Sequence, residues 1–67
     1  MLRSEGEVRR TLERASRTLE RGEVIEVEVS EAVLEFTVDE AIRRGLSVVD
    51  AYEKEGCVVV VIERRHY

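Results

Sequence analysis

The C-terminal part of the sequence contains the run Cys57-Val58-Val59-Val60-Val61-Ile62, which is apolar at every position. A strand of this kind belongs in the middle of a sheet, because both of its faces need to be covered. The segment before it, Lys54-Glu55-Gly56, predicts a tight turn with its glycine at the position that requires a positive φ. We therefore expect a β-hairpin made of Leu46–Glu53 and Cys57–Arg64, after which the tail, residues 63–67, returns to water.

Farther upstream, the most clearly marked element is a helix that begins after Ser4. Ser4 and Glu7 have the spacing of a capping box, in which each side chain accepts a hydrogen bond from the backbone N–H of the other residue. Apolar residues then recur at helical spacing and predict one buried face: Val8, Leu12, Ala15 and Leu19. We expect Gly22 to end this helix in a left-handed conformation.

The middle of the chain combines a clear strand with an ambiguous segment. Residues 23–29 alternate apolar and acidic side chains, which predicts a strand with one buried face. Residues 30–45 fit one helix capped by Ser30 and ended by Gly45, or a strand over 32–38 followed by a short helix that begins at Thr37. We favour the single helix, because the strand needs a tight turn at Ser30 without the Gly, Asn or Asp that hairpin turns prefer.

These elements predict one α+β domain over residues 1–67, in the order helix–strand–helix–strand–strand. The expected architecture is a two-layer sandwich with both helices on one face of a small mixed sheet. The strands at 23–29 and 46–53 are joined through a helix, so we expect them to be parallel with a right-handed crossover.

Composition limits the classes of function. The chain is 43% apolar and 39% charged with a net charge of −4, which is typical of a folded domain. No apolar run reaches the roughly 20 residues that span a membrane, and no signal peptide is recognisable, so a cytoplasmic location is the default. One cysteine permits no internal disulfide, and we expect neither a metal nor a cofactor.

The bias toward arginine has several interpretations. Many ion pairs and the absence of Asn and Gln suit a thermophilic protein, but a GC-rich genome produces the same arginine bias. The regular patterning also leaves a designed origin open, against which the near-absence of lysine argues.

Four segments occupy the corners of this pattern: Leu2-Arg3-Ser4-Glu5-Gly6-Glu7-Val8, Gly22-Glu23-Val24-Ile25-Glu26-Val27, Arg44-Gly45-Leu46-Ser47-Val48 and Glu55-Gly56-Cys57-Val58-Val59-Val60. In this order they resemble the TusA/SirA-like sulfur-carrier family. That family opens its first helix with a Gly-Leu-x-Cys-Pro-x-Pro-hydrophobic motif, enters a strand through Gly-Glu, turns a Gly-His corner and ends in a hairpin with a Gly turn.

The departures from this family bear on activity. In the family the motif cysteine carries a persulfide that is handed to partner proteins, whereas here Ser4 stands at that position and Glu5 and Glu7 replace the prolines. A hydroxyl cannot carry a persulfide, so the resemblance implies the fold and not the sulfurtransferase activity. The family's first strand has no counterpart, and we expect strand 23–29 to lie at a sheet edge.

Two side chains are candidate nucleophiles. Ser4 has no base beside it in the sequence, and its role as a helix cap explains its presence. Cys57 follows a turn and is a candidate relocated sulfur acceptor, but Glu53 and Glu55 lie close to it and oppose a lowered thiol pKa. We favour a packing role for this cysteine. His66 with Glu63 would make a poor metal site.

Two charged regions are candidate binding surfaces. Arg10, Arg14, Arg17 and Arg21 form a stripe opposite the apolar face of the first helix, which suits an acidic partner or RNA, or a solvated face with ion pairs. Net negative charge and few aromatic residues speak against nucleic acid. Residues 23–42 carry seven acidic and no basic side chains, which either attract a basic partner or a second copy, or discourage edge pairing.

We therefore predict a non-catalytic protein-interaction domain that forms a homodimer. Two helices cover only one face of the sheet, and the other face would carry an apolar patch of Cys57, Val59, Val61, Val49 and Ala51. Pairing of two such faces about a two-fold axis would bury the patch. The alternative functions are a persulfide carrier that uses Cys57 and a weak RNA-binding protein that uses the arginine stripe.

Overall fold

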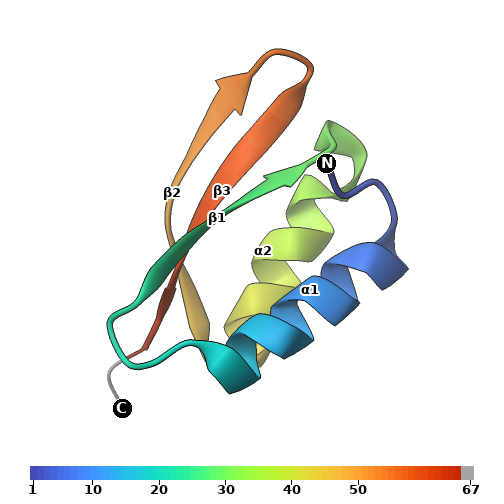
Figure 1. The fold of residues 1–67 in the computed structure, drawn as a ribbon. Coiled ribbons are helices and arrows are strands. Elements are labelled where there is room, and N and C mark those ends of the chain that lie inside the picture. The colour runs from blue at the N-terminus through green and yellow to red at the C-terminus, as the bar shows by residue number, and fades with distance from the viewer. Residues whose placement is uncertain (66–67) are drawn as a thin grey trace.

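The computed structural model describes residues 1–65, and Figure 1 shows both helices on one face of a three-stranded sheet. The elements are helix α1 (Glu5–Thr18), strand β1 (Val24–Val29), the 3₁₀ turn η1 (Glu31–Val33), helix α2 (Leu34–Arg43), strand β2 (Leu46–Lys54) and strand β3 (Cys57–Arg64). The predicted α+β class, the order of the elements and the two layers are confirmed.

Strand β3 lies at the centre of the sheet, as its apolar sequence predicted. The strand order is β1-β3-β2, and both outer strands pair antiparallel with β3. β1 and β2 therefore point the same way, as expected for strands joined through a helix, but β3 separates them. Among residues 1–65 the sheet is mixed only through one isolated parallel bridge, between Leu2 and Val29 on the outer edge of β1.

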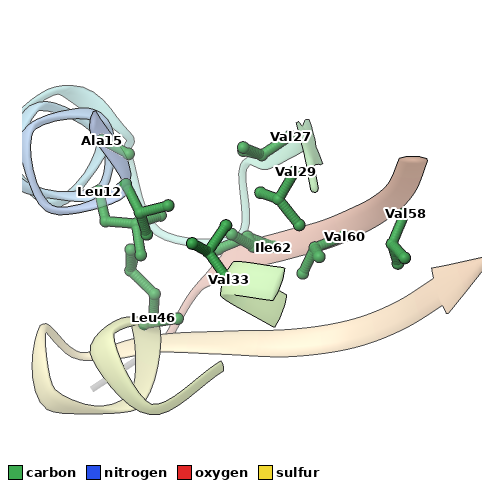
Figure 2. Close-up of a cluster of buried hydrophobic side chains, with 11 residues drawn as sticks. Leu12, Ala15, Val27, Val29, Val33, Leu46, Val58, Val60 and Ile62 are labelled. Atoms are coloured by element: carbon green, nitrogen blue, oxygen red, sulfur yellow. The ribbon is translucent and has the colours of Figure 1, made fainter. Parts of the chain in front are cut away.

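The hydrophobic core lies between the sheet and the helices. Figure 2 shows Leu12 of α1 and Leu46 of β2 pointing into the same cluster as Val60 and Ile62 of β3. The other buried members of this cluster are Val8, Ala15, Val27, Val29, Val33, Ala41 and Val58. Full burial of one such Val, Leu or Ile side chain contributes about 1.5–3 kcal/mol, so this cluster is the main source of stability.

The start of α1 is the predicted capping box, but its end is not where the sequence indicated. The Ser4 hydroxyl accepts from the Glu7 N–H at 3.2 Å, and the Glu7 carboxylate accepts from the Ser4 N–H at 3.1 Å. The helix ends at Thr18, and Gly22, with φ of 83°, lies in the turn before β1. The prediction that Gly22 ends the helix is wrong, because the backbone is already extended at Leu19; the Arg64 side chain bonds the carbonyls of Ser16 and Leu19 there.

The helical interpretation of residues 30–45 is confirmed and the strand alternative is wrong. The irregular part is the η1 turn, which precedes α2. Thr37 does not cap a second helix, because its buried hydroxyl donates to the Val33 carbonyl at 2.7 Å from within α2. Ser30 precedes η1 without a side-chain cap, so that part of the prediction is wrong. Gly45 follows the helix with φ of 75°, as expected.

A chain of charged side chains joins the two helices. Glu40 of α2 is buried, and its carboxylate accepts from the Arg44 Nε at 2.8 Å. Arg44 also reaches the Glu13 carboxylate of α1 at 4.0 Å. Nearby, the Arg9 guanidinium lies over the Phe36 ring, 5.5 Å from its centroid. These side-chain contacts link α1 to α2.

Candidate functional site

The face of the sheet that points away from the helices is not covered by another part of residues 1–65 (Figure 1). We call it the open face. It consists of Cys57, Val59 and Val61 on β3, flanked by Glu26 and Glu28 on β1 and by Asp50 and Tyr52 on β2. The open face therefore has an apolar central row with carboxylates on both sides.

An ion pair crosses the central row of the open face. Lys54 of β2 lies opposite Cys57, and Glu28 of β1 lies opposite Val59. The Lys54 Nζ and the Glu28 carboxylate are 3.4 Å apart, and this hydrogen bond raises the pKa of Lys54. The pair spans β3, and Val59 is only 2% exposed although it is not part of the main core cluster.

The predicted apolar patch is correct on β3 and wrong on β2. A register shift between Val48 and Asp50 makes Ala51 the partner of Val60, which belongs to the helix-facing core. Ala51 therefore faces the helix side, and Val49 lies at the irregularity itself, 52% exposed. One extra residue in a strand reverses the alternation of every residue beyond it.

Tyr52 is the open-face residue that the sequence analysis missed. It lies opposite Val59 and is 44% exposed, so a large amphipathic side chain stands beside the apolar row. The adjacent apolar pair Val48-Val49, which interrupts an otherwise regular alternation, is the sequence signal that would have located the bulge and placed Tyr52 on this face.

Cys57 lies at one end of the open face in an acidic setting. Its side chain is half-buried and lines a hollow together with Glu31, Glu53, Glu55 and Lys54. Glu53 is the cross-strand partner of the helix-facing Val58, so its side chain lies on the opposite face of the sheet from Cys57. Lys54, the cross-strand partner of Cys57, is paired with Glu28.

Ser4 is committed to the cap of α1. Its hydroxyl accepts from the Glu7 N–H and lies 3.2 Å from a carboxylate oxygen of the same residue, to which it donates. The hydrogen bond from the Arg3 N–H, with further hydrogen bonds from Ser4, lowers the pKa of Glu7. The structure thus places Ser4 in the predicted structural role, next to a carboxylate that is held in its charged form.

Three of the four arginines predicted as a stripe lie together on α1. Arg10, Arg14 and Arg17 line a shallow hollow with Glu13 and Thr18. Arg17 pairs with Glu13 at 2.8 Å, which is the ion-paired surface that the sequence allowed. Arg21, the fourth, follows α1 in the turn before β1 and does not line this hollow.

Within residues 1–65, no group of three or more His, Cys, Asp or Glu side chains is placed to hold a metal ion. His66, considered above with Glu63, lies outside the described residues. Over the same part of the chain, neither helix has the length and apolar character that crossing a membrane requires. No protein-family model matches the chain, and neither curated proteins nor solved structures give a match.

Proposed function

We infer that this chain is a non-catalytic protein-interaction domain that binds its partner on the open face of the sheet. The observation that carries this proposal is a sheet face with no helix over it, on which the half-exposed Tyr52 and the partly exposed Cys57 and Val61 surround the buried Val59. Tyrosine is enriched at protein–protein interfaces, whose buried core is more apolar than the polar rim around it.

The charges on the open face bear on the choice of partner. Glu26 and Asp50 flank Val61, and Glu28 flanks Val59. Pairing two open faces about a two-fold axis would bring these carboxylates together, and like charges across an interface are unfavourable. We therefore favour a different, basic protein over the homodimer that the sequence suggested. Self-association by a different surface is compatible with these charges: a second copy would present the arginines of its α1 to the open face.

The kinship with TusA/SirA-like proteins belongs to the same proposal. Its support is the order of the elements and the three glycines at its corners, Gly22, Gly45 and Gly56, all of which have positive φ. A strand over residues 32–38 would have contradicted the element order of this family. Helix α2 instead occupies most of that segment. From this family we transfer the fold of a carrier that docks on partner proteins. We do not transfer the persulfide chemistry, because Ser4 stands where the family has its cysteine.

Site-specific photo-crosslinking in the native cell tests the docking face. A crosslinking amino acid at position 61 probes the open face, and the same group at position 43, on the exposed Arg43 of α2, is the matched control. We expect a discrete heterologous adduct at position 61 that Glu26→Lys with Asp50→Lys abolishes. Equal labelling at both positions, or none at position 61, would overturn the proposal, and an adduct with the same chain would replace the basic partner by a second copy.

The alternative, a persulfide carrier, rests on Cys57 and its cross-strand neighbour Lys54. Glu31, Glu53 and Glu55 line the same hollow, and the Lys54 ammonium is already paired with Glu28. We therefore rank this function below the interaction domain.

A further inference from the structure

The outer edge of β1, which faces away from β3, already pairs with one residue of another segment, Leu2. The Leu2 N–H donates to the Glu28 carbonyl at 2.8 Å, and the Ser30 N–H donates to the Leu2 carbonyl at 2.8 Å. These two hydrogen bonds make a parallel bridge opposite Val29. This bridge is the only pairing on that edge among residues 1–65, so the outward backbone groups of β1 before Glu28 have no strand partner within this part of the chain.

The bridge shows which backbone groups of β1 point outward. In a strand the N–H and C=O of one residue point to the same side, and alternate residues point to opposite sides. Because the Glu28 carbonyl and the Ser30 N–H face Leu2, the even-numbered residues Val24, Glu26 and Glu28 present their backbone groups to the free edge. The odd-numbered residues bond to β3, and the hydrogen bond from the Arg64 N–H to the Glu23 carbonyl agrees with this alternation.

The same register fixes the side chains that a strand added there would need. Leu2 pairs with Val29 and packs against the core, so residues opposite Val27 and Ile25 would also face the helix layer and should be apolar. The position opposite Glu28 belongs to Met1, which precedes Leu2, so an added strand would end opposite Val27. Its residue opposite Glu26 would stand on the open face beside the exposed carboxylates of Glu26 and Glu28. Opposite charges on cross-strand neighbours are favourable, which selects lysine or arginine at this position.

The other edge of the sheet differs from this one. The ladder between β2 and β3 is interrupted by the register shift between Val48 and Asp50, and bulges are a common device against edge pairing. The ladder between β1 and β3 is regular over all of its pairs. Antiparallel pairing of β1 with β1 of a second copy would place the glutamates of both strands side by side, which is unfavourable.

We propose that the outer edge of β1 is a strand-addition site for an extended segment of a partner protein in which apolar and cationic residues alternate, running parallel to β1 as Leu2 does. Main-chain hydrogen bonds to Glu26 and Glu28 provide affinity, and their carboxylates provide selectivity for cations. This site is distinct from docking on the flat open face, because it uses the backbone at the edge of the sheet.

The probe is the synthetic peptide acetyl-Val-Lys-Val-Lys-Val-amide, with acetyl-Val-Glu-Val-Glu-Val-amide as the charge control. Amide hydrogen exchange followed by NMR on the wild-type chain gives a direct readout. We expect the lysine peptide to slow exchange of the outward Glu26 and Glu28 amides by roughly tenfold or more, and to leave the inward Val27 amide unchanged. The glutamate peptide should have no effect.

Two variants distinguish the contribution of backbone hydrogen bonds to peptide binding from the contribution of charge. Glu26→Pro removes an outward N–H without touching the bonds between β1 and β3, since proline is tolerated at edges of this kind. Glu26→Pro should weaken peptide binding by roughly tenfold or more. Glu26→Gln should weaken binding less, but it should remove most of the salt dependence of binding. Arg43→Ala, at an exposed position on α2, should leave peptide binding unchanged. Unprotected Glu26 and Glu28 amides at saturating peptide, or wild-type affinity of a folded Glu26→Pro chain, would overturn the proposal.

Discussion

The guanidinium of Arg64, at the end of the central strand, donates a hydrogen bond of 3.1 Å to the backbone carbonyl of Leu19, the residue that closes α1. The same nitrogen donates to the Ser16 carbonyl. The last carbonyls of a helix lack partners within the helix, and a cation there also interacts favourably with the helix dipole. One side chain of β3 thus attaches the end of α1 to the sheet.

Removal of this attachment should destabilise the whole domain. Arg64→Ala leaves part-buried carbonyls without their donor, and we expect it to lower the free energy of unfolding by about 1–3 kcal/mol in urea titrations. Arg64→Lys should recover part of the loss, because it retains a cation. Arg43→Ala, at an exposed position on α2, is the control and should change stability by less than about 0.5 kcal/mol. Equal effects of Arg64→Ala and Arg43→Ala would contradict this role.

The capping box of α1 should make stability depend on acidic pH. The pKa of Glu7 is lowered in the folded state, so its carboxylate stabilises the fold above the ordinary value of 4.5. This contribution is lost as the pH falls through the lowered folded value. The melting temperature of Glu7→Gln should therefore lie below that of the wild type at pH 7, and the two should converge in stronger acid.

Glu55→Gln, in the exposed turn of the hairpin, is the control for this pH dependence, and it should melt like the wild type at both pH values. A Glu7→Gln deficit that persists unchanged at the acidic end would mean that the carboxylate charge is not what stabilises the cap.

The buried Glu40 should be sensitive to loss of Arg44. Arg44→Ala leaves a carboxylate inside the helix interface without its 2.8 Å partner, which should cost about 1–3 kcal/mol of unfolding free energy. The double variant Glu40→Gln/Arg44→Ala should be more stable than Arg44→Ala alone, because the unpaired charge is gone. Arg17→Ala, which breaks an exposed pair, is the control and should cost less than about 1 kcal/mol. A double variant no more stable than Arg44→Ala would refute the argument.

The persulfide-carrier alternative can be tested on Cys57 directly. After incubation with a persulfide donor, intact-mass analysis should show no stable gain of one sulfur atom, because the cation beside Cys57, Lys54, is already paired with Glu28. Lys54→Ala should not change this outcome. A sulfur adduct on Cys57 that disappears in Lys54→Ala would instead favour the carrier function over the interaction domain.

The parts of the fold that could be predicted are those with a local cause. The Ser4 capping box, the alternation in β1 and the glycine turn at Gly56 each depend on residues within a few positions of one another. The apolar run of β3 was sufficient to place that strand at the centre of the sheet. Helix α2 was predicted because a hairpin turn at Ser30 lacks suitable residues.

The parts that were missed depend on contacts between distant segments. Arg64 was assigned to a tail in water, whereas it bonds residues more than 40 positions away in the sequence. The side chain of Ala51 was placed on the wrong face, because a bulge is set by how two strands fit together. The bridge at Leu2 has no periodic signal, since a single residue cannot show alternation. The face of the sheet on which each side chain lies was therefore predicted correctly along β3 and incorrectly along β2.

The central position of β3 also has a consequence for biosynthesis. Both of the sheet's ladders require residues 57–64, and Val24 meets Glu63 only after the intervening segment has been made. A nascent chain that has left the ribosome only as far as α2 therefore lacks the strand with which β1 pairs. We expect the sheet, and the core that packs on it, to form only after the valine-rich segment has emerged.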